Sequence, residues 1–188
     1  KFLNFLSKHI NLPNLGEVLE AFRQQYPGIP LEHTSLSNDE VPVQLQNGTL
    51  DAGLVMDLGG CATGLARTAL SQHTTAVMVS RSSPFWERIH ISPAELDGQT
   101  LLVPGFAPDA LAPLWQALQE SGAHPQLELG KQFYQVLYRT QEQNCVSLNR
   151  FEEASHSQMT NVRNVILDGL PPICAGFLRP KKQHNACA

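Results

Sequence analysis

The stretch "SNDEVPVQLQNGTLDAGLV", residues 37–55, decides the fold. Ser37 and Glu40 have the S-x-x-E spacing of a capping box, in which each residue satisfies a main-chain amide of the other at a helix start. We expect the helix to end at Gly48, because glycine readily adopts the left-handed conformation that terminates helices. The apolar run "LDAGLVM" at 50–56 then predicts a strand. A capped helix start so close to a buried strand suggests that the cap lines a small-molecule cleft.

The residues before this stretch continue the alternation. "KFLNFLS" at 1–7 and "IPLEHTSL" at 29–36 each predict a strand. Between them, apolar residues recur at the spacings of three and four that mark one face of a helix over 12–26: Leu12, Leu15, Leu19, Phe22 and Tyr26. The order strand, helix, strand, helix, strand predicts a parallel sheet with covering helices.

The residues after this stretch predict more strands and helices. A second capping box, Ser92 and Glu95, predicts a short helix, and Gly122 ends a longer amphipathic one. The expected helices beyond this short one lie at 109–121 and 132–141. The expected strands lie at 65–70, 74–80, 99–105, 125–130, 144–149, 162–169 and 171–179.

This order predicts an α/β protein with two lobes. Lobe I is expected at 1–72 and 176–188, and lobe II at 73–175. The chain then crosses between the lobes twice, which makes a hinge with a cleft. Ligands of open α/β sheets bind beyond the carboxyl ends of the strands, and this cleft is where we expect a ligand.

Composition excludes several classes of protein. The chain has 188 residues, 42% of them hydrophobic, and a formal charge of −4 with its 13 basic residues scattered, so alone it is a poor nucleic-acid binder. No apolar run approaches the roughly 18 residues of a membrane helix. The first residues are too short and polar for a secretory signal, and the abrupt start at Lys1 is expected of a fragment. Four cysteines without C-x-x-C spacing indicate reduced cytosolic thiols: Cys61, Cys145, Cys174 and Cys187.

The run "LPNLGEVLEAFRQQYPGIPLEHTSLSNDEVPVQLQNGTLDAGLV" at 12–55 resembles the effector-binding domain of LysR-type transcriptional regulators. That family has an L-P-x-L helix, an F-x-x-x-Y-P stop, a Ser- or Thr-capped helix and a G-x-L-D strand. The matching residues are Leu12, Pro13, Phe22, Tyr26, Pro27, Ser37, Gly48, Leu50 and Asp51. "HTTAVMVSRSSPF" at 73–85 and "ISPAELDGQTLLVP" at 91–104 extend the resemblance, which continues to about residue 130.

The chain departs from the family pattern in its later part. "YRTQEQNCVSLNR" at 138–150 has no glycine, and Asn149 stands where the family has a proline. The final "RPKKQHNACA" is too short and polar for the family's last helix. The winged helix-turn-helix and linker helix of the family are absent from this chain.

The resemblance implies a type 2 periplasmic-binding-protein-like fold of two Rossmann-like lobes. It implies a cytoplasmic, ligand-sensing domain of a bacterial regulator, not an enzyme, with no cofactor and no metal. A small effector, expected to be a carboxylate, would bind between the lobes. A homodimer would form through helices 12–26 and 109–121. The full-length protein could form a tetramer. DNA would be bound only by the missing N-terminal domain. The alternative is an exported solute-binding protein of a transporter; an enzyme would need a catalytic group that the sequence does not offer.

The expected ligand contacts lie at helix starts and strand ends, where unpaired amides attract a carboxylate. Lys8 would favour an anion, whereas Ser37 could equally be a helix cap and no more. In lobe I the expected contacts are Ser7, Lys8, His9, Ile10, Asn11, Leu36, Ser37 and Asn38. In lobe II they are Phe106, Lys131, Gln132 and Phe133, with Asn149 at the hinge.

Overall fold

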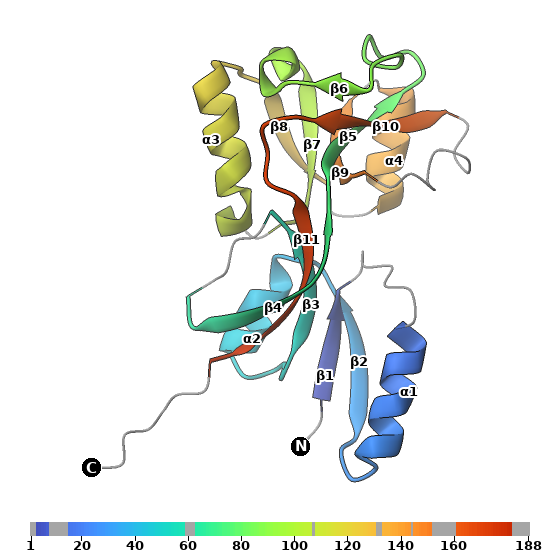
Figure 1. Ribbon diagram of the computed structural model, residues 1–188, viewed down its shortest axis with the longest axis vertical. Coiled ribbons are helices and arrows are strands. Elements are labelled where there is room, and N and C mark those ends of the chain that lie inside the picture. Colours follow the sequence, from blue (N-terminus) through green and yellow to red (C-terminus); the bar gives the residue numbers. More distant parts are fainter. Residues whose placement is uncertain are drawn as a thin grey trace. The chain divides into compact units, whose positions relative to one another are not determined.

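A computed structural model describes residues 3–7, 15–58, 63–106, 108–130, 133–143, 145–151 and 161–181. The fold is α/β, as predicted (Figure 1). The chain divides into two compact units, with boundaries after residues 56 and 60, within strand β4, Leu65–His73, and within strand β11, Ile173–Pro180. Unit 1 comprises residues 1–56, 61–70 and 175–188, and unit 2 comprises 57–60 and 71–174.

Unit 1 begins with the predicted alternation of strands and helices. The elements are β1 Leu3–Ser7, α1 Leu15–Gln25, β2 Leu31–Leu36, α2 Glu40–Gln46 and β3 Gly53–Asp57. Strands β1 and β2 pair in parallel, as predicted. Strand β3 lies in a separate three-stranded sheet of order β3-β11-β4, so its hydrogen-bonded neighbour comes from the other end of the chain.

The core of unit 1 forms where α2 packs on β3. Val41 and Leu45, the predicted inward face of α2, pack in one buried cluster with Leu50, Val55, Leu65 and Leu178. A Cβ atom on Gly53 would lie only 2.3 Å from Cγ1 of Val41, so the missing side chain lets the helix approach the strand. The helix that carries the capped turn is thereby fixed on the strand that follows it.

Unit 2 is built on a six-stranded sheet of order β6-β10-β5-β9-β7-β8. Its strands are β5 Thr75–Ser80, β6 His90–Ile91, β7 Thr100–Pro104, β8 Gln126–Gly130, β9 Val146–Arg150 and β10 Val162–Leu167. Its helices are α3 Ala112–Ser121 and α4 Phe133–Glu142, with 3-10 turns at Pro93–Leu96 and Pro108–Leu111. The two-residue strand β6 is not among the predicted elements.

Helices α3 and α4 cover opposite faces of this sheet (Figure 1). Strands β7, β8 and β9 are parallel, with β7 between the other two. The chain goes from β7 to β8 through α3 and returns past β7 to β9 through α4, and right-handed crossovers in opposite directions place their helices on opposite faces. Leu101, Leu102 and Val103 are consequently all buried, as expected of a strand covered on both sides.

The second capping box forms as predicted. The Ser92 side chain accepts the Glu95 main-chain N–H, and the Glu95 carboxylate accepts the Ser92 main-chain N–H at 2.9 Å and its hydroxyl at 3.2 Å. The amide hydrogen bond from Ser92, helped by the nearby Arg88, lowers the pKa of Glu95.

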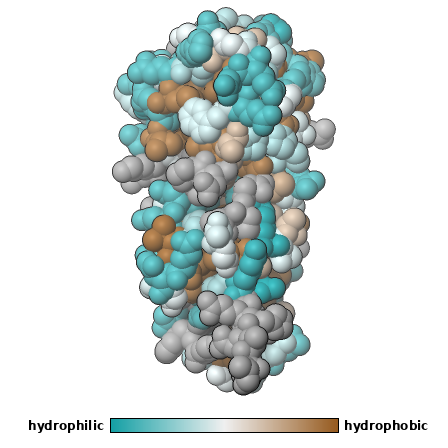
Figure 2. Space-filling model, turned by 90° about the vertical axis from the view of Figure 1, so that its left-hand side faces the viewer, coloured by the Kyte–Doolittle hydropathy of each residue, from teal (hydrophilic) through white to brown (hydrophobic). Residues whose placement is uncertain are grey.

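On the face drawn in Figure 2, hydrophobic residues lie in small groups among hydrophilic ones. Within the described part of the chain, no helix has the length and apolar character needed to cross a membrane.

Candidate functional site

In unit 1, predicted contact residues meet at the carboxyl ends of β1 and β2. Because the two strands are parallel, their carboxyl ends share one edge. Ser7, the last residue of β1, is in register with Leu36, the last residue of β2, after an irregularity between Phe5 and Ser7. Ser37 and Asn38 follow directly, so the structure brings these four predicted residues together.

The Ser37–Glu40 turn differs in part from the predicted capping box. Glu40 does accept the Ser37 main-chain N–H at 2.8 Å, as predicted. The Ser37 hydroxyl, however, donates to the same carboxylate at 2.6 Å instead of accepting a main-chain amide. A hydrogen bond to a charged acceptor is stronger than one between neutral groups, which explains this choice. The main-chain amides of Glu40 and Val41 instead donate to the Ser37 carbonyl. The N-cap residue of α2 is Asp39, not Ser37.

Asn38 ties the end of β2 to the end of β3. Its side chain is 3% exposed, and its Oδ1 atom accepts a hydrogen bond from the Met56 main-chain N–H at 3.2 Å. Burying an amide in an apolar core is costly unless it is hydrogen-bonded. This bond fixes the residues on either side of Asn38 at the strand ends.

Several predicted contacts cannot be placed. Lys8, His9, Ile10, Asn11, Lys131 and Gln132 lie outside the described residues. Phe133 is described as the first residue of α4.

In unit 2, the parallel strands β7, β8 and β9 end at a common carboxyl edge, at Pro104, Gly130 and Arg150. Phe106 follows β7 and is 3% exposed, so it belongs to the packed interior of this edge. A Cβ atom on Gly130 would lie 2.3 Å from Cγ2 of Val136. The bare glycine therefore allows α4 to start close against the end of β8.

Asn149 is held by a second asparagine that sequence reasoning missed. Its Nδ2 atom donates to Oδ1 of Asn164 at 3.1 Å. Asn149 pairs with Ala76, and Asn164 pairs with Met78 on the other side of β5. Residues two apart on a strand share a face, so both amides lie on one face of the sheet, the face that also carries Ala76 and Met78 of β5. A polar residue within the apolar run "VRNVIL" was the available signal for Asn164.

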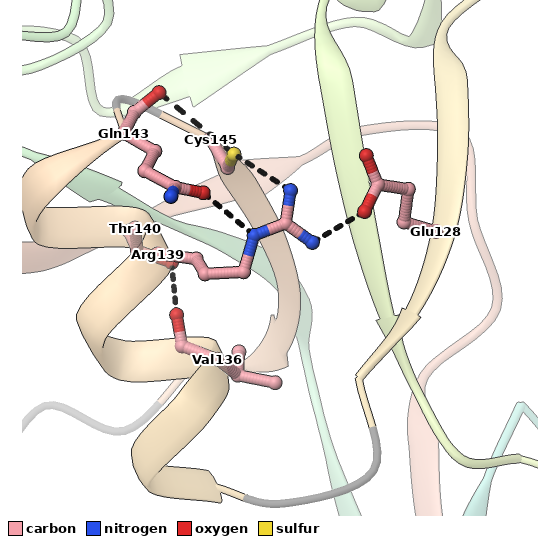
Figure 3. A network of polar contacts seen from close by, with 6 residues as sticks. All are labelled: Glu128, Val136, Arg139, Thr140, Gln143 and Cys145. Atoms are coloured by element: carbon pink, nitrogen blue, oxygen red, sulfur yellow. Dashed lines mark hydrogen bonds and ion pairs between the residues drawn. The ribbon is translucent and has the colours of Figure 1, made fainter.

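An ion pair fixes α4 on β8 (Figure 3). Arg139 of α4 donates through Nη1 to the Glu128 carboxylate and through Nε to Gln143 Oε1 at 2.8 Å. Its Nη2 atom lies 3.9 Å from the Cys145 sulfur. The hydrogen bond from Arg139 lowers the pKa of Glu128 and raises that of Arg139. These contacts hold α4, the helix that begins at the carboxyl edge, against β8.

The part of the chain that the structure describes lacks the arrangement that a metal ion needs. The described residues contain no group of three or more His, Cys, Asp or Glu side chains placed to hold a metal ion. The Asn38, Asn149 and Asn164 side chains bond to groups of the protein itself, so their identified role is to hold the strand ends.

Comparison with known proteins identifies relatives. A family model described as "LysR substrate binding domain" matches residues 7–134. A sequence search among curated proteins gives no match.

Several solved structures have a similar fold. The effector binding domain of a BenM variant superposes with a TM-score of 0.73 at 16% identity, over 99% of this chain and 88% of that one. The BenM effector binding domain with its effector benzoate gives 0.68 at 17% identity, over 99% and 86%. HinK, a LysR family transcriptional regulator from Pseudomonas aeruginosa, gives 0.68 at 15% identity, over 96% of this chain and 63% of HinK. At these identities the superpositions establish the fold.

Proposed function

Because this chain belongs to the LysR substrate binding domain family, we propose that it senses a small anionic effector for a bacterial transcriptional regulator. Its role is to bind and signal, without turnover. A solute-binding protein of a transporter, the alternative with the same fold, is not favoured, since the matching family and the similar structures are those of regulators.

One observation carries the proposal of a binding site in unit 1. Ser7, Leu36, Ser37 and Asn38, which the family resemblance implies as contacts, come together at the carboxyl ends of β1 and β2. Carboxyl ends of parallel strands are where open α/β sheets bind ligands. The Ser37 hydroxyl can exchange its bond to Glu40 for one to a ligand, because both side chains lie at the exposed start of α2 and not in the core.

We propose a small carboxylate as the effector class. BenM, a structural relative, binds benzoate. The positive charge of Lys8, which the family resemblance implies as a contact, suits an anion better than a neutral molecule. Binding would shift the balance between two arrangements of the domain only to the extent that the effector prefers one of them.

The regulator is proposed to act as a cytoplasmic homodimer. Each of the two helices named for the interface exposes hydrophobic side chains, with Val18 on α1 62% exposed and Trp115 on α3 43% exposed. Helix α1 has no buried side chain over residues 16–25, and we propose that the partner's α3 covers it. We propose that DNA contact and a tetramer require a DNA-binding domain in addition to the residues of this chain.

A ligand screen tests the proposal. The 188-residue chain is screened by thermal shift against small carboxylates, including benzoate, and their neutral amides. We expect a carboxylate to raise the melting temperature, and isothermal titration then measures its affinity for the Ser37→Ala variant. Loss of one hydrogen bond should weaken binding by about 3- to 10-fold.

Ser92→Ala is the matched control. Ser92 makes the same two bonds to Glu95 that Ser37 makes to Glu40, but in unit 2. Both variants lose a similar helix contact, so only a ligand contact distinguishes them. If the two variants bind the best carboxylate with equal affinity, Ser37 does not contact the ligand.

A further inference from the structure

The sequence holds three pairs in which an asparagine or aspartate precedes a glycine: Asn47–Gly48, Asp97–Gly98 and Asp168–Gly169. In such a pair the glycine main-chain nitrogen can attack the side-chain carbonyl carbon of the preceding residue, because glycine has no side chain to hinder the approach. The product is a five-membered succinimide ring. An amide reacts in this way more readily than an ionised carboxylate, since ammonia is the better leaving group. Chemistry therefore favours Asn47 over the two aspartates.

The surroundings of the three side chains favour the same residue. Asp97 Oδ1 accepts the His124 main-chain N–H at 2.8 Å, and Asp168 Oδ1 lies 3.0 Å from Nδ1 of His90. Asn47 is exposed at the C-cap of α2. Within the described part of the chain, no group forms a hydrogen bond with the Asn47 side-chain amide. Its carbonyl carbon is consequently open to attack.

The turn that follows Asn47 opposes this attack. The Gly48 N–H donates to the Leu45 carbonyl at 3.2 Å, and the next two main-chain N–H groups both donate to the Gln44 carbonyl, at 3.0 and 3.1 Å. The reacting nitrogen must lose its proton, which this bond holds. A succinimide ring also fixes ψ of its asparagine far from the −5° that Asn47 has here. The turn must therefore open locally before the ring can close.

We propose that Asn47 is a site of spontaneous deamidation and that the closed turn sets its rate. In the first step the Gly48 nitrogen bonds to Asn47 Cγ. The bond from Cγ to the side-chain nitrogen breaks, and ammonia leaves with the proton that the Gly48 nitrogen gives up. In the second step water adds to a ring carbonyl, and the bond from that carbon to the ring nitrogen breaks. Opening at Cγ gives aspartate, whereas opening at the main-chain carbonyl gives isoaspartate, whose main chain is longer by a methylene group.

Both products change the end of α2, and the inference does not depend on the proposed effector. Each places a carboxylate at the carboxyl end of the helix, where the helix dipole disfavours negative charge. The longer main chain of isoaspartate also displaces the bonds that close the turn. Leu45 and Leu50, on either side of the turn, belong to the buried cluster of unit 1. The modified chain should therefore melt at a lower temperature than the unmodified one.

Peptide mapping by mass spectrometry tests the site. The folded 188-residue chain is incubated at mildly alkaline pH, and the conversion of each asparagine to the acid is followed with time. We expect Asn47 to react before every other asparagine. Asn47→Gln is the matched variant, because it keeps an exposed amide but would have to form a six-membered ring, which closes much more slowly. It should leave this peptide unmodified.

A comparison of folded and unfolded chains tests the role of the turn. In urea, which removes the turn, Asn47 should react at least about 10-fold faster than in the folded chain, because the folded chain reacts only while the turn is open. Hydrogen exchange of the Gly48 amide measures the same opening. Raising the temperature below the melting transition should increase the exchange rate and the deamidation rate, each corrected by its value in the unfolded chain, by the same factor.

Each outcome decides the inference. If Asn47→Gln gains acid as fast as the wild type, another residue is the site and the proposal is wrong. If the folded wild type stays unmodified after the unfolded chain has fully reacted, the native protein has no modification site at Asn47. Equal rates in the folded and unfolded chains would show that the turn does not set the rate.

Discussion

The Asn38 side-chain oxygen accepts the Met56 main-chain amide at 3.2 Å, and this bond joins the end of β2 to the end of β3. The two strands belong to different sheets, so the bond is a direct link between them at the edge where the ligand is proposed to bind. Ser37, one residue before Asn38, is held in place by this anchor and by its own turn.

Replacing Asn38 by leucine should destabilise the chain by about 1–3 kcal/mol, because the buried Met56 amide loses its acceptor. Urea unfolding followed by circular dichroism measures the change. Asn47→Ala, at the exposed end of α2, is the control and should change stability by less than about 0.5 kcal/mol. Equal effects of the two substitutions would show that the Asn38 bond contributes nothing.

Gly130→Ala should destabilise the chain by about 1–3 kcal/mol, because the new Cβ atom would lie 2.3 Å from Val136. Adding Val136→Ala should recover part of this loss, since it removes the atom that clashes. Gly16→Ala is the control, with open space around its Cβ position in α1, and should leave the chain as stable or slightly more so. An additive double mutant would indicate that the two residues do not meet.

The Glu128–Arg139 pair should make stability depend on pH. The folded protein holds the pKa of Glu128 below its usual value, chiefly through the hydrogen bond from Arg139. The pair's contribution is therefore present above the usual pKa and is lost as the pH falls through the lowered one. Glu128→Gln should lose less stability than the wild type between about pH 6 and pH 3. Parallel acid profiles of melting temperature for the two proteins would contradict this.

The proposed dimer should separate when a charge enters its interface. Trp115→Glu or Val18→Glu should convert dimer to monomer in sedimentation velocity at micromolar concentration, because each places a carboxylate in an apolar contact. Val43→Glu, on the exposed side of α2, introduces the same charge elsewhere and should leave the dimer intact. A wild-type chain that is monomeric at every concentration tested would end the dimer proposal.

Local pattern predicts most of this fold, because helices and strands follow from periodicity and from capping residues. The box at Ser92 and Glu95 forms as expected, and Gly122 adopts the left-handed conformation that ends α3. Val41 and Leu45 face the core of unit 1 as their spacing predicts.

Features that depend on distant residues escape such reasoning. The pairing of β3 with β11 joins segments more than a hundred residues apart, and the two-residue β6 exists only because β10 lies beside it. The role of Asn164 depends on its hydrogen bond with Asn149. The two residues lie on β10 and β9, which are separated in the sheet by β5. The Ser37 hydroxyl was assigned the wrong partner, since the spacing of a capping box does not show which acceptor is nearer.

The central claim, that a small carboxylate binds at the carboxyl ends of the strands, is tested most directly by amide chemical-shift mapping. The isotopically labelled chain is titrated with the carboxylate that gives the largest thermal shift. We expect the largest saturable changes at the amides of Leu36, Ser37 and Asn38 and at those of Asn149 to Phe151. Changes confined to the opposite ends of the same strands, at residues 31–32 of β2 and 146–147 of β9, with none at these amides, would contradict it.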